Sequence, residues 1–163
     1  MPSHREQKLL PYSPDQLFEL VIDVEHYPEF LPWCLAARVT SREAQSVTAD
    51  LVIGFKMVRE RFTSKVSFDR QARLVETRNI QGPFRHLRSD WAFKQHDEGC
   101  LVDFSVDFEF RSRMLQRLIQ PLFHEAVRRM VAAFEGRARA LYGTADQRTR
   151  GAGRVGIISD GSS

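Results

Sequence analysis

Residues 100–110, CLVDFSVDFEF, have the most regular hydrophobic pattern in the chain. Apolar and polar positions alternate with a period of two, which is the side-chain spacing of a β-strand. Such alternation predicts an antiparallel strand with one buried face and one face in water. The apolar face would carry Phe104, Val106, Phe108 and Phe110, and the polar face Asp103, Ser105, Asp107 and Glu109.

Shorter segments of strand-like pattern occupy much of the chain before residue 111, separated by polar, glycine or proline positions. Segments at this spacing are typical of an antiparallel meander. The predicted strands are 5–11, 35–44, 46–58, 60–70, 73–80, 86–96 and 99–111.

A short helix is predicted over residues 14–24, where apolar positions recur at helical spacing. Ser13 and Gln16 have the spacing of a capping box, and Pro14 suits the first helical position. The segment HYPEFLPWC follows, in which Pro28 and Pro32 each disfavour helix in the preceding residue. We therefore expect a short turn of helix between two bends.

A long C-terminal helix is predicted from a continuous apolar stripe between residues 112 and 143. Ser112 can cap its start and Gly143 can end it. At helical rise its length of about 30 residues would reach about 45 Å, and Pro121 should kink it. The stripe consists of Leu115, Leu118, Ile119, Leu122, Phe123, Ala126, Val127, Met130, Ala133, Phe134 and Leu141.

The stripe needs an apolar surface of matching size, and the apolar face of the sheet is the candidate. By parity that face includes Trp91 and Phe93. A twisted sheet curves, so a helix can leave a gap above it, most plausibly where Pro121 bends the helix near Leu122 and Val106. The pattern alone leaves a solid core and an apolar pocket equally open, because the same residue types line both.

The length and composition fit one globular domain, which we assign to residues 1–143. Residues 144–163 are rich in Gly, Ser, Thr and Arg and are predicted to be a disordered tail. The tail contains GAGRVG, a formal match to GxGxxG. A dinucleotide site needs that motif between a strand and a helix, so we give it no function.

The cysteines and the N-terminus favour a reducing, cytoplasmic location. Cys34 and Cys100 form no CxxC pair, and the start of the chain has no apolar signal core. No apolar run approaches the roughly 20 residues of a membrane span.

Positive charge is concentrated in the C-terminal helix. The chain has a net charge of +3, which is too weak to indicate nucleic-acid binding by itself. Residues 112–142 hold six arginines against Glu125 and Glu135, and therefore carry +4. A functional basic patch and an ordinary solvated helix face are both open. The arginines are Arg113, Arg117, Arg128, Arg129, Arg137 and Arg139.

No catalytic or metal site is predicted. His124-Glu125 begins like HExxH, but Arg128 stands where the second zinc ligand belongs. The acidic positions of 103–109 lie on the polar face of an amphipathic strand, where they would be solvated rather than paired for acid–base catalysis. Cys34 next to Trp33 is typical of a small core residue, and the five histidines are scattered.

Four segments in this order resemble the coenzyme Q-binding protein family, over roughly residues 3–143. They are HYPEFLPWC, IQGPFRHLRSDWAF, VDFSVDFEF and RMVAAFEGRARALYG. This family is a branch of the START-like polyketide cyclase and lipid-transport superfamily. The resemblance implies an α+β helix-grip fold, START-like and Bet v 1-like: a curved seven-stranded antiparallel sheet around a long C-terminal helix, with two short helices near the N-terminus.

The resemblance also implies a hydrophobic tunnel that binds ubiquinone or a related isoprenoid lipid in support of respiration, with no catalytic step and no cofactor besides the bound quinone. The tunnel would be lined by Tyr27, Phe30, Leu31, Trp33, Phe84, Trp91, Phe93, Phe104, Val106, Phe108, Phe110, Leu118, Leu122 and Met130. Arg78, Ser89 or Tyr27 would hold the quinone head, and the basic helix face could contact an anionic membrane surface, peripheral to the inner membrane.

Two other functions stay open at this point. A sister branch is the bacterial ribosome-association toxin, which blocks subunit joining and shares the GPF, WxF and DFEF motifs, so these motifs do not separate the branches. An RNA- or ribosome-binding inhibitor would use the basic helix face, and its binding would fall steeply with salt. An aromatase/cyclase enzyme is the third alternative, although no acid–base pair is visible in the sequence.

Overall fold

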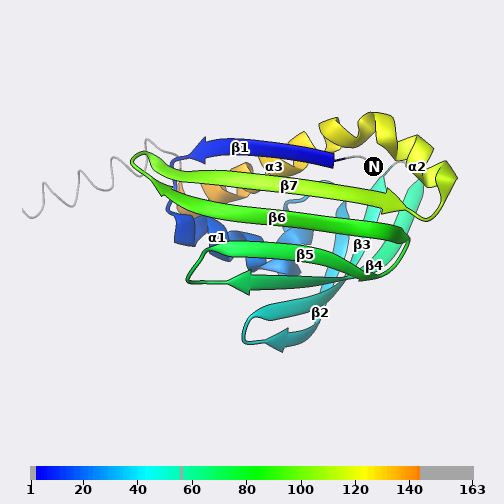
Figure 1. Ribbon diagram of the computed structural model, residues 1–163, viewed down its shortest axis with the longest axis horizontal. Coiled ribbons are helices and arrows are strands. Elements are labelled where there is room, and N and C mark those ends of the chain that lie inside the picture. The colour runs from blue at the N-terminus through cyan, green and yellow to red at the C-terminus, as the bar shows by residue number, and fades with distance from the viewer. Residues whose placement is uncertain (1–2, 56, 144–163) are drawn as a thin grey trace, which may run out of the picture.

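The computed structural model describes residues 3–55 and 57–143. It contains a seven-stranded antiparallel sheet and a C-terminal helical segment, as the sequence predicts (Figure 1). The strands are β1 (Ser3–Leu10), β2 (Cys34–Glu43), β3 (Ser46–Phe55), β4 (Val58–Asp69), β5 (Leu74–Gln81), β6 (Phe84–His96) and β7 (Gly99–Phe110).

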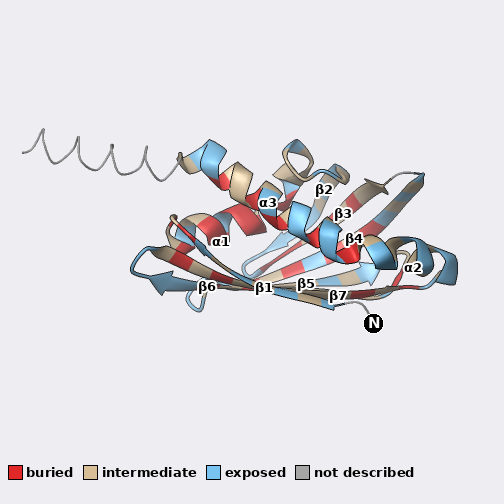
Figure 2. Ribbon diagram, turned by 90° about the horizontal axis from the view of Figure 1, so that it is seen from above, coloured by how far each residue is buried: buried red, intermediate tan, exposed pale blue. Residues whose placement is uncertain are grey.

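Strands β2 to β7 form a meander, and β1 closes the far edge beside β7. The spatial order is β1-β7-β6-β5-β4-β3-β2. Irregularities of register interrupt β2, β4 and the start of β6, between Phe84 and His86. Such bulges bend a strand and increase its twist. The sheet accordingly curls upward toward the helices along its β2–β4 side (Figure 2).

The first helix begins as its capping residues predict, and it ends at Ile22 rather than at the predicted residue 24. Helix α1 (Pro14–Ile22) begins at Ser13, whose side chain accepts a hydrogen bond from the Gln16 amide while the Gln16 side chain reaches back to the Ser13 amide. This reciprocal arrangement is the predicted capping box. The chain then enters a 3₁₀ helix, η1 (Val24–Glu29), which is the expected helical turn before the second bend.

The predicted C-terminal helix consists of three consecutive segments. They are α2 (Arg113–Ile119), the 3₁₀ turn η2 (Gln120–Leu122) and α3 (Phe123–Tyr142). The interruption contains Pro121, whose ring and missing N–H oppose a continuous α-helix. The predicted ends are confirmed: the Ser112 hydroxyl accepts from the Leu115 amide, and Gly143 at φ 85° ends α3.

The core lies between the sheet and the helices, where buried residues of the strands, α1 and α3 form one hydrophobic cluster. Figure 2 marks the buried residues in red. On β7 the predicted alternation holds, since Phe104, Phe108 and Phe110 are buried and Val106 is partly buried against them. The fold is therefore the predicted START-like, Bet v 1-like helix grip. The tail predicted at 144–163, including its GxGxxG match, lies outside the described residues.

Candidate functional site

The segment HYPEFLPWCL packs along α3 and closes one side of the space beneath it. Tyr27 and Phe30 each contact the ring of Phe134, at centroid distances of 5.4 and 5.2 Å. The Arg137 guanidinium lies over the Phe30 ring at 5.2 Å, a cation–π geometry. The Tyr27 hydroxyl donates to the Val21 carbonyl. The two bends therefore hold an aromatic cluster against the helix.

An apolar cavity of about 230 Å³ lies between the sheet and the segment from α2 to α3. Leu122, next to Pro121, and Val106 both line it, which is where the sequence pattern predicts the gap. The complete lining is Trp33, Ile53, Phe55, Phe84, Leu87, Val106, Phe108, Phe110, Ile119, Leu122, Phe123, Ala126, Val127 and Met130.

Seven of the fourteen residues predicted from the sequence line this cavity. Its position follows from the small side chain of Val106, which stands between Phe104 and Phe108 on the inner face of β7, and from the break in the helix above it. Whether these residues bind a ligand stays a prediction. They are Trp33, Phe84, Val106, Phe108, Phe110, Leu122 and Met130.

The other seven predicted residues lie outside the cavity. Trp91 and Phe104 belong to a filled core beneath α3, with ring centroids 4.2 Å apart and Phe134 5.1 Å from Trp91. The side chain of Leu118 is turned outward on α2 and is 43% exposed. The set is Tyr27, Phe30, Leu31, Trp91, Phe93, Phe104 and Leu118.

Sequence reasoning missed seven of the lining residues. Ile53 and Phe55 continue the inward alternation of β3, so that signal was available. Leu87 has the same parity on β6 as Trp91 and Phe93, so that signal was available too, whereas the bulge between Phe84 and His86 takes Phe84 out of this alternation. The missed residues are Ile53, Phe55, Leu87, Ile119, Phe123, Ala126 and Val127.

Aromatic contacts make much of the cavity wall. Trp33 packs edge-on against Phe55 at 5.5 Å, Phe84 stacks on Phe110 at 4.8 Å, and Phe108 contacts Phe123 at 4.7 Å. Such ring pairs add specific geometry to their burial. The wall is therefore preformed by side chains that hold one another.

All fourteen lining residues are of apolar type, so among the described residues no titratable group faces the cavity. That Arg78, Ser89 or Tyr27 holds a ligand head stays a prediction, and none of the three is among the residues that line the cavity. Arg78 pairs with Glu76 at 2.8 Å on an outward-facing position of β5, Tyr27 is bonded to Val21, and Ser89 is absent from the lining. The arrangement can bury apolar surface, and it offers no acid, base or nucleophile.

The two thiols are also unsuited to nucleophilic chemistry at neutral pH. Burial raises the pKa of Cys34 to about 11 and that of Cys100 to about 11. A thiol is reactive as the thiolate, so both residues are protonated and inert near pH 7. This agrees with the interpretation of Cys34 as a packing residue.

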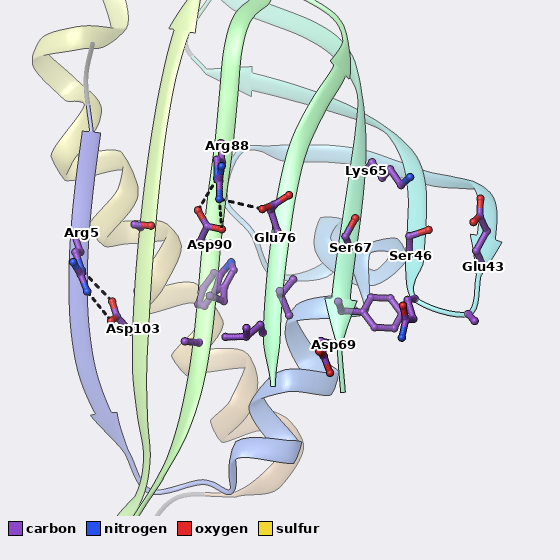
Figure 3. Close-up of a pocket in the computed structure, with 18 residues that line it drawn as sticks. Arg5, Glu43, Ser46, Lys65, Ser67, Asp69, Glu76, Arg88, Asp90 and Asp103 are labelled. Atoms are coloured by element: carbon purple, nitrogen blue, oxygen red, sulfur yellow. Dashed lines mark hydrogen bonds and ion pairs between the residues drawn. The ribbon is translucent and has the colours of Figure 1, made fainter. Parts of the chain in front are cut away.

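The opposite face of the sheet carries a broad, open depression of about 1110 Å³, whose lining mixes charged and polar residues with apolar ones (Figure 3). Several of its charges form ion pairs: Arg5 of β1 bonds Asp103 of β7 at 3.0 Å, and Arg88 of β6 contacts Glu76 of β5 at 3.1 Å and Asp90 of its own strand at 2.9 Å. The hydrogen bond from Arg5 lowers the pKa of Asp103. These carboxylates belong to surface ion pairs, as expected for a solvated face.

Two histidine groups lie near other polar residues. His26 forms a group with Asp23 and Glu25, in which a ring nitrogen of His26 and one carboxylate oxygen of each acidic residue lie within 4.8 Å of one another. His4 and His124, far apart in sequence, approach to 2.9 Å between their Nδ1 atoms. No sequence signal pointed to that second contact, which depends on α3 crossing β1.

Within residues 3–55 and 57–143, no helix combines the length and the apolar character needed to cross a membrane.

Comparison with known proteins places this chain in a family. Residues 10–135 match the model of the family described as polyketide cyclase/dehydrase and lipid transport. The chain is 42% identical to the ribosome association toxin RatA of Rickettsia prowazekii, over 86% of this chain and 99% of that protein. It is 36% identical to the mitochondrial coenzyme Q-binding protein COQ10 homolog B of Xenopus laevis, over 86% of this chain and 59% of that protein.

A solved structure agrees with this assignment. The 18 kDa protein CC1736 from Caulobacter crescentus superposes with a TM-score of 0.72 at 36% identity, covering 88% of this chain and all of that one. The family match spans most of the sheet and the helix that grips it. The chain therefore belongs to the polyketide cyclase/dehydrase and lipid transport family.

Proposed function

We propose that the protein binds ubiquinone or a related isoprenoid lipid in the cavity between β7 and the segment from α2 to α3, and carries it in support of respiratory electron transport. The observation that carries this proposal is the lining itself, in which every side chain is apolar. Removing apolar surface from water gains about 25 cal/mol per Å². A lipid tail is the class of ligand that such a lining favours.

The cavity volume limits what can enter. Ligand sites commonly occupy ~300–1,000 Å³, whereas this cavity has about 230 Å³. It therefore suits one ring or a few isoprene units rather than a complete polyprenyl tail. Because no polar group lines it, the quinone oxygens would stay at the opening, near water, with the first isoprene units inside.

The proposal involves binding without a chemical step. The printed name of the Xenopus laevis relative refers to coenzyme Q binding, which supports a quinone as the ligand. An aromatase/cyclase activity is not proposed, although the family description includes cyclases, because no titratable residue is among the fourteen that line the cavity.

A second candidate function is inhibition of ribosomal subunit association. The relative from Rickettsia prowazekii, at 42% identity, carries the name of a ribosome association toxin. The arginines Arg113, Arg117 and Arg128 have no acidic partner in the described part of the chain and could contact RNA phosphates. This candidate requires no ligand in the cavity.

The test is the quinone content of protein purified from a quinone-containing cell, for the wild type and Val106→Phe. Val106 lines the cavity, so the added ring should fill it at little cost in stability and abolish quinone retention. The quinone is extracted and measured by mass spectrometry, and stability is measured by urea denaturation.

Val102→Phe is the matched control. Val102 faces inward on the same strand but is buried outside the cavity, at 6% exposure. Overpacking there should cost ~1–3 kcal/mol. The carrier proposal would be contradicted if the wild type carried no quinone and Val106→Phe destabilised the protein as much as Val102→Phe does. Inhibition of ribosomal subunit association would then be the better supported function.

A further inference from the structure

We infer that the protein docks onto an anionic lipid bilayer through the end that borders the cavity, using α2 and Met57, which directly precedes β4. This inference rests on the proposed lipid-binding function and names the surface that would exchange the lipid. We call this surface the docking face; it consists of Met57, Arg113, Met114, Arg117 and Leu118.

The docking face exposes large apolar side chains that the fold does not use. Met57 is 98% exposed and Met114 75% exposed, and Leu118 follows Met114 by one helical turn at 43%. Helix α2 has no buried residue. Its other apolar positions, Leu115 and Ile119, pack partly buried against the core. Helix α2 therefore has apolar side chains on two faces. The rest of the protein covers one of these faces, and the other face is exposed.

The charge of the docking face is positive and unneutralised. Residues 111–124 include three arginines and no acidic residue. Arg113 and Arg117 have no ion-pair partner in the described ranges, and neither has Arg128 at the start of α3. Farther along α3, Arg129 pairs with Glu125 and Arg139 with Glu135. The free positive charge is thus concentrated at one end of the C-terminal segment.

Both parts of the docking face border the same cavity. On one side Ile119 of α2 and Leu122 line it, and on the other side Phe55, two residues before Met57, lines it. The β3–β4 end and α2 lie at the same end of the molecule in both views (Figures 1 and 2). A bilayer in contact with Met57 and Met114 would face the cavity, so a lipid could pass without crossing bulk water.

The exposed side chains favour a bilayer over RNA as the partner. Single-stranded RNA is bound by arginines together with aromatic rings on which bases stack. The exposed apolar residues here are Met57, Met114 and Leu118, which cannot stack but can enter the boundary between headgroups and acyl chains. Interfacial binding combines such apolar insertion with attraction of basic residues to anionic lipids.

The test is cosedimentation with vesicles of phosphatidylcholine and phosphatidylglycerol, compared with pure phosphatidylcholine. The wild type should bind the anionic vesicles more tightly. Each arginine near the surface contributes ~1 kcal/mol, so Arg113→Gln with Arg117→Gln should weaken binding up to about 30-fold. Met114→Ser, and Met57→Ser independently, should each weaken it by roughly tenfold.

Arg139→Gln and Leu141→Ser are matched controls at the far end of α3, where Leu141 is 50% exposed. They should leave vesicle binding unchanged. The inference is overturned if the wild type does not bind anionic vesicles, or if the control variants weaken vesicle binding as much as the docking-face variants do. It is also overturned if the arginine variants weaken vesicle binding while Met57→Ser and Met114→Ser leave it unchanged.

Quinone content measured without vesicles separates this inference from the proposed function. Once loaded with quinone from detergent, the docking-face variants should retain it like the wild type, because none of the five docking-face residues lines the cavity. A wild type that retains quinone but ignores vesicles would overturn the docking face alone. A wild type that binds vesicles through Met57 and Met114 but never carries quinone would support the docking face and overturn the carrier proposal.

Discussion

At the scale of single residues, position along β7 decides whether an aromatic ring fills the core or borders a cavity. Phe104 lies beneath the regular part of α3 and packs with Trp91 in a solid cluster. Two residues on, Val106 lies near the interrupted segment around Leu122, and its smaller side chain leaves space. The neighbouring Phe108 then forms the wall of that space. One valine in a row of phenylalanines thus sets the boundary between core and cavity.

Tyr27 provides a residue-scale prediction about pH. Burial of its hydroxyl end raises the pKa of Tyr27 above its ordinary value of 10.0. The unfolded chain therefore releases this proton first, and the stabilisation present below pH 10 is lost as pH rises toward the folded pKa. By pH 11 the wild type should lose roughly 1 kcal/mol more stability than Tyr27→Phe, relative to pH 9.

The measurement is urea denaturation of both proteins at pH 9 and pH 11. Comparing them removes the shared contributions of Cys34, Cys100 and Tyr142, whose pKa values burial also raises. At pH 9, Tyr27→Phe should be less stable by about 1 kcal/mol, because the Val21 carbonyl loses its donor. Equal pH dependence of the two proteins would show that the Tyr27 hydroxyl is not held as described.

At the scale of elements, the C-terminal segment combines two helices with different tasks. Helix α3 buries Phe123, Val127, Val131 and Phe134 against the sheet, whereas α2 buries no residue. The 3₁₀ turn with Pro121 separates them. Because α2 reaches the core only through the partly buried Leu115 and Ile119, its outward side chains are available to a partner.

Glycines in α3 and in the β5–β6 turn give an element-scale prediction. A Cβ at Gly136 would meet no atom within 4 Å, so Gly136→Ala should stabilise the protein by about 0.5–1 kcal/mol through helix propensity. Gly82 has φ +148°, and a Cβ there would lie 2.4 Å from Cβ of Phe62. Gly82→Ala should destabilise it by roughly 1–3 kcal/mol.

Thermal and urea unfolding of both alanine variants check this pair. The signs should be opposite, since one site is open helix and the other is a crowded turn beside β4. Destabilisation by Gly136→Ala would mean that α3 meets a neighbour at that position, which the packing described above does not include.

The sequence predicted elements better than it predicted the site. Strand alternation and the capping residues at Ser13 and Ser112 specify local structure, and these predictions are confirmed. The cavity lining depends on the bulge after Phe84 and on how α2 leaves the sheet, and neither leaves a periodic signal. Leu118 shows the difference, because its helical spacing is that of the core stripe while its side chain is exposed.

At the scale of the whole molecule, the two faces of the sheet have separate chemistry. The outer face pairs charges across neighbouring strands, as Arg88 of β6 does with Glu76 of β5. The inner face is apolar, and it ends in the cavity and the docking face at the end of the molecule that carries α2. This arrangement suits a protein that takes an apolar ligand from a surface and keeps it from water.

The most direct test of ligand binding uses the two tryptophans, because Trp33 lines the cavity and Trp91 is buried in the filled core. In Trp91→Phe, fluorescence reports on Trp33 alone; in Trp33→Phe it reports on Trp91. Titration with a ubiquinone that has a short isoprenoid tail should quench Trp33 saturably and Trp91 much less. Adding Val106→Phe to the Trp91→Phe protein should abolish the saturable quenching. Absence of saturable quenching of Trp33, or quenching unaffected by Val106→Phe, would contradict binding in this cavity.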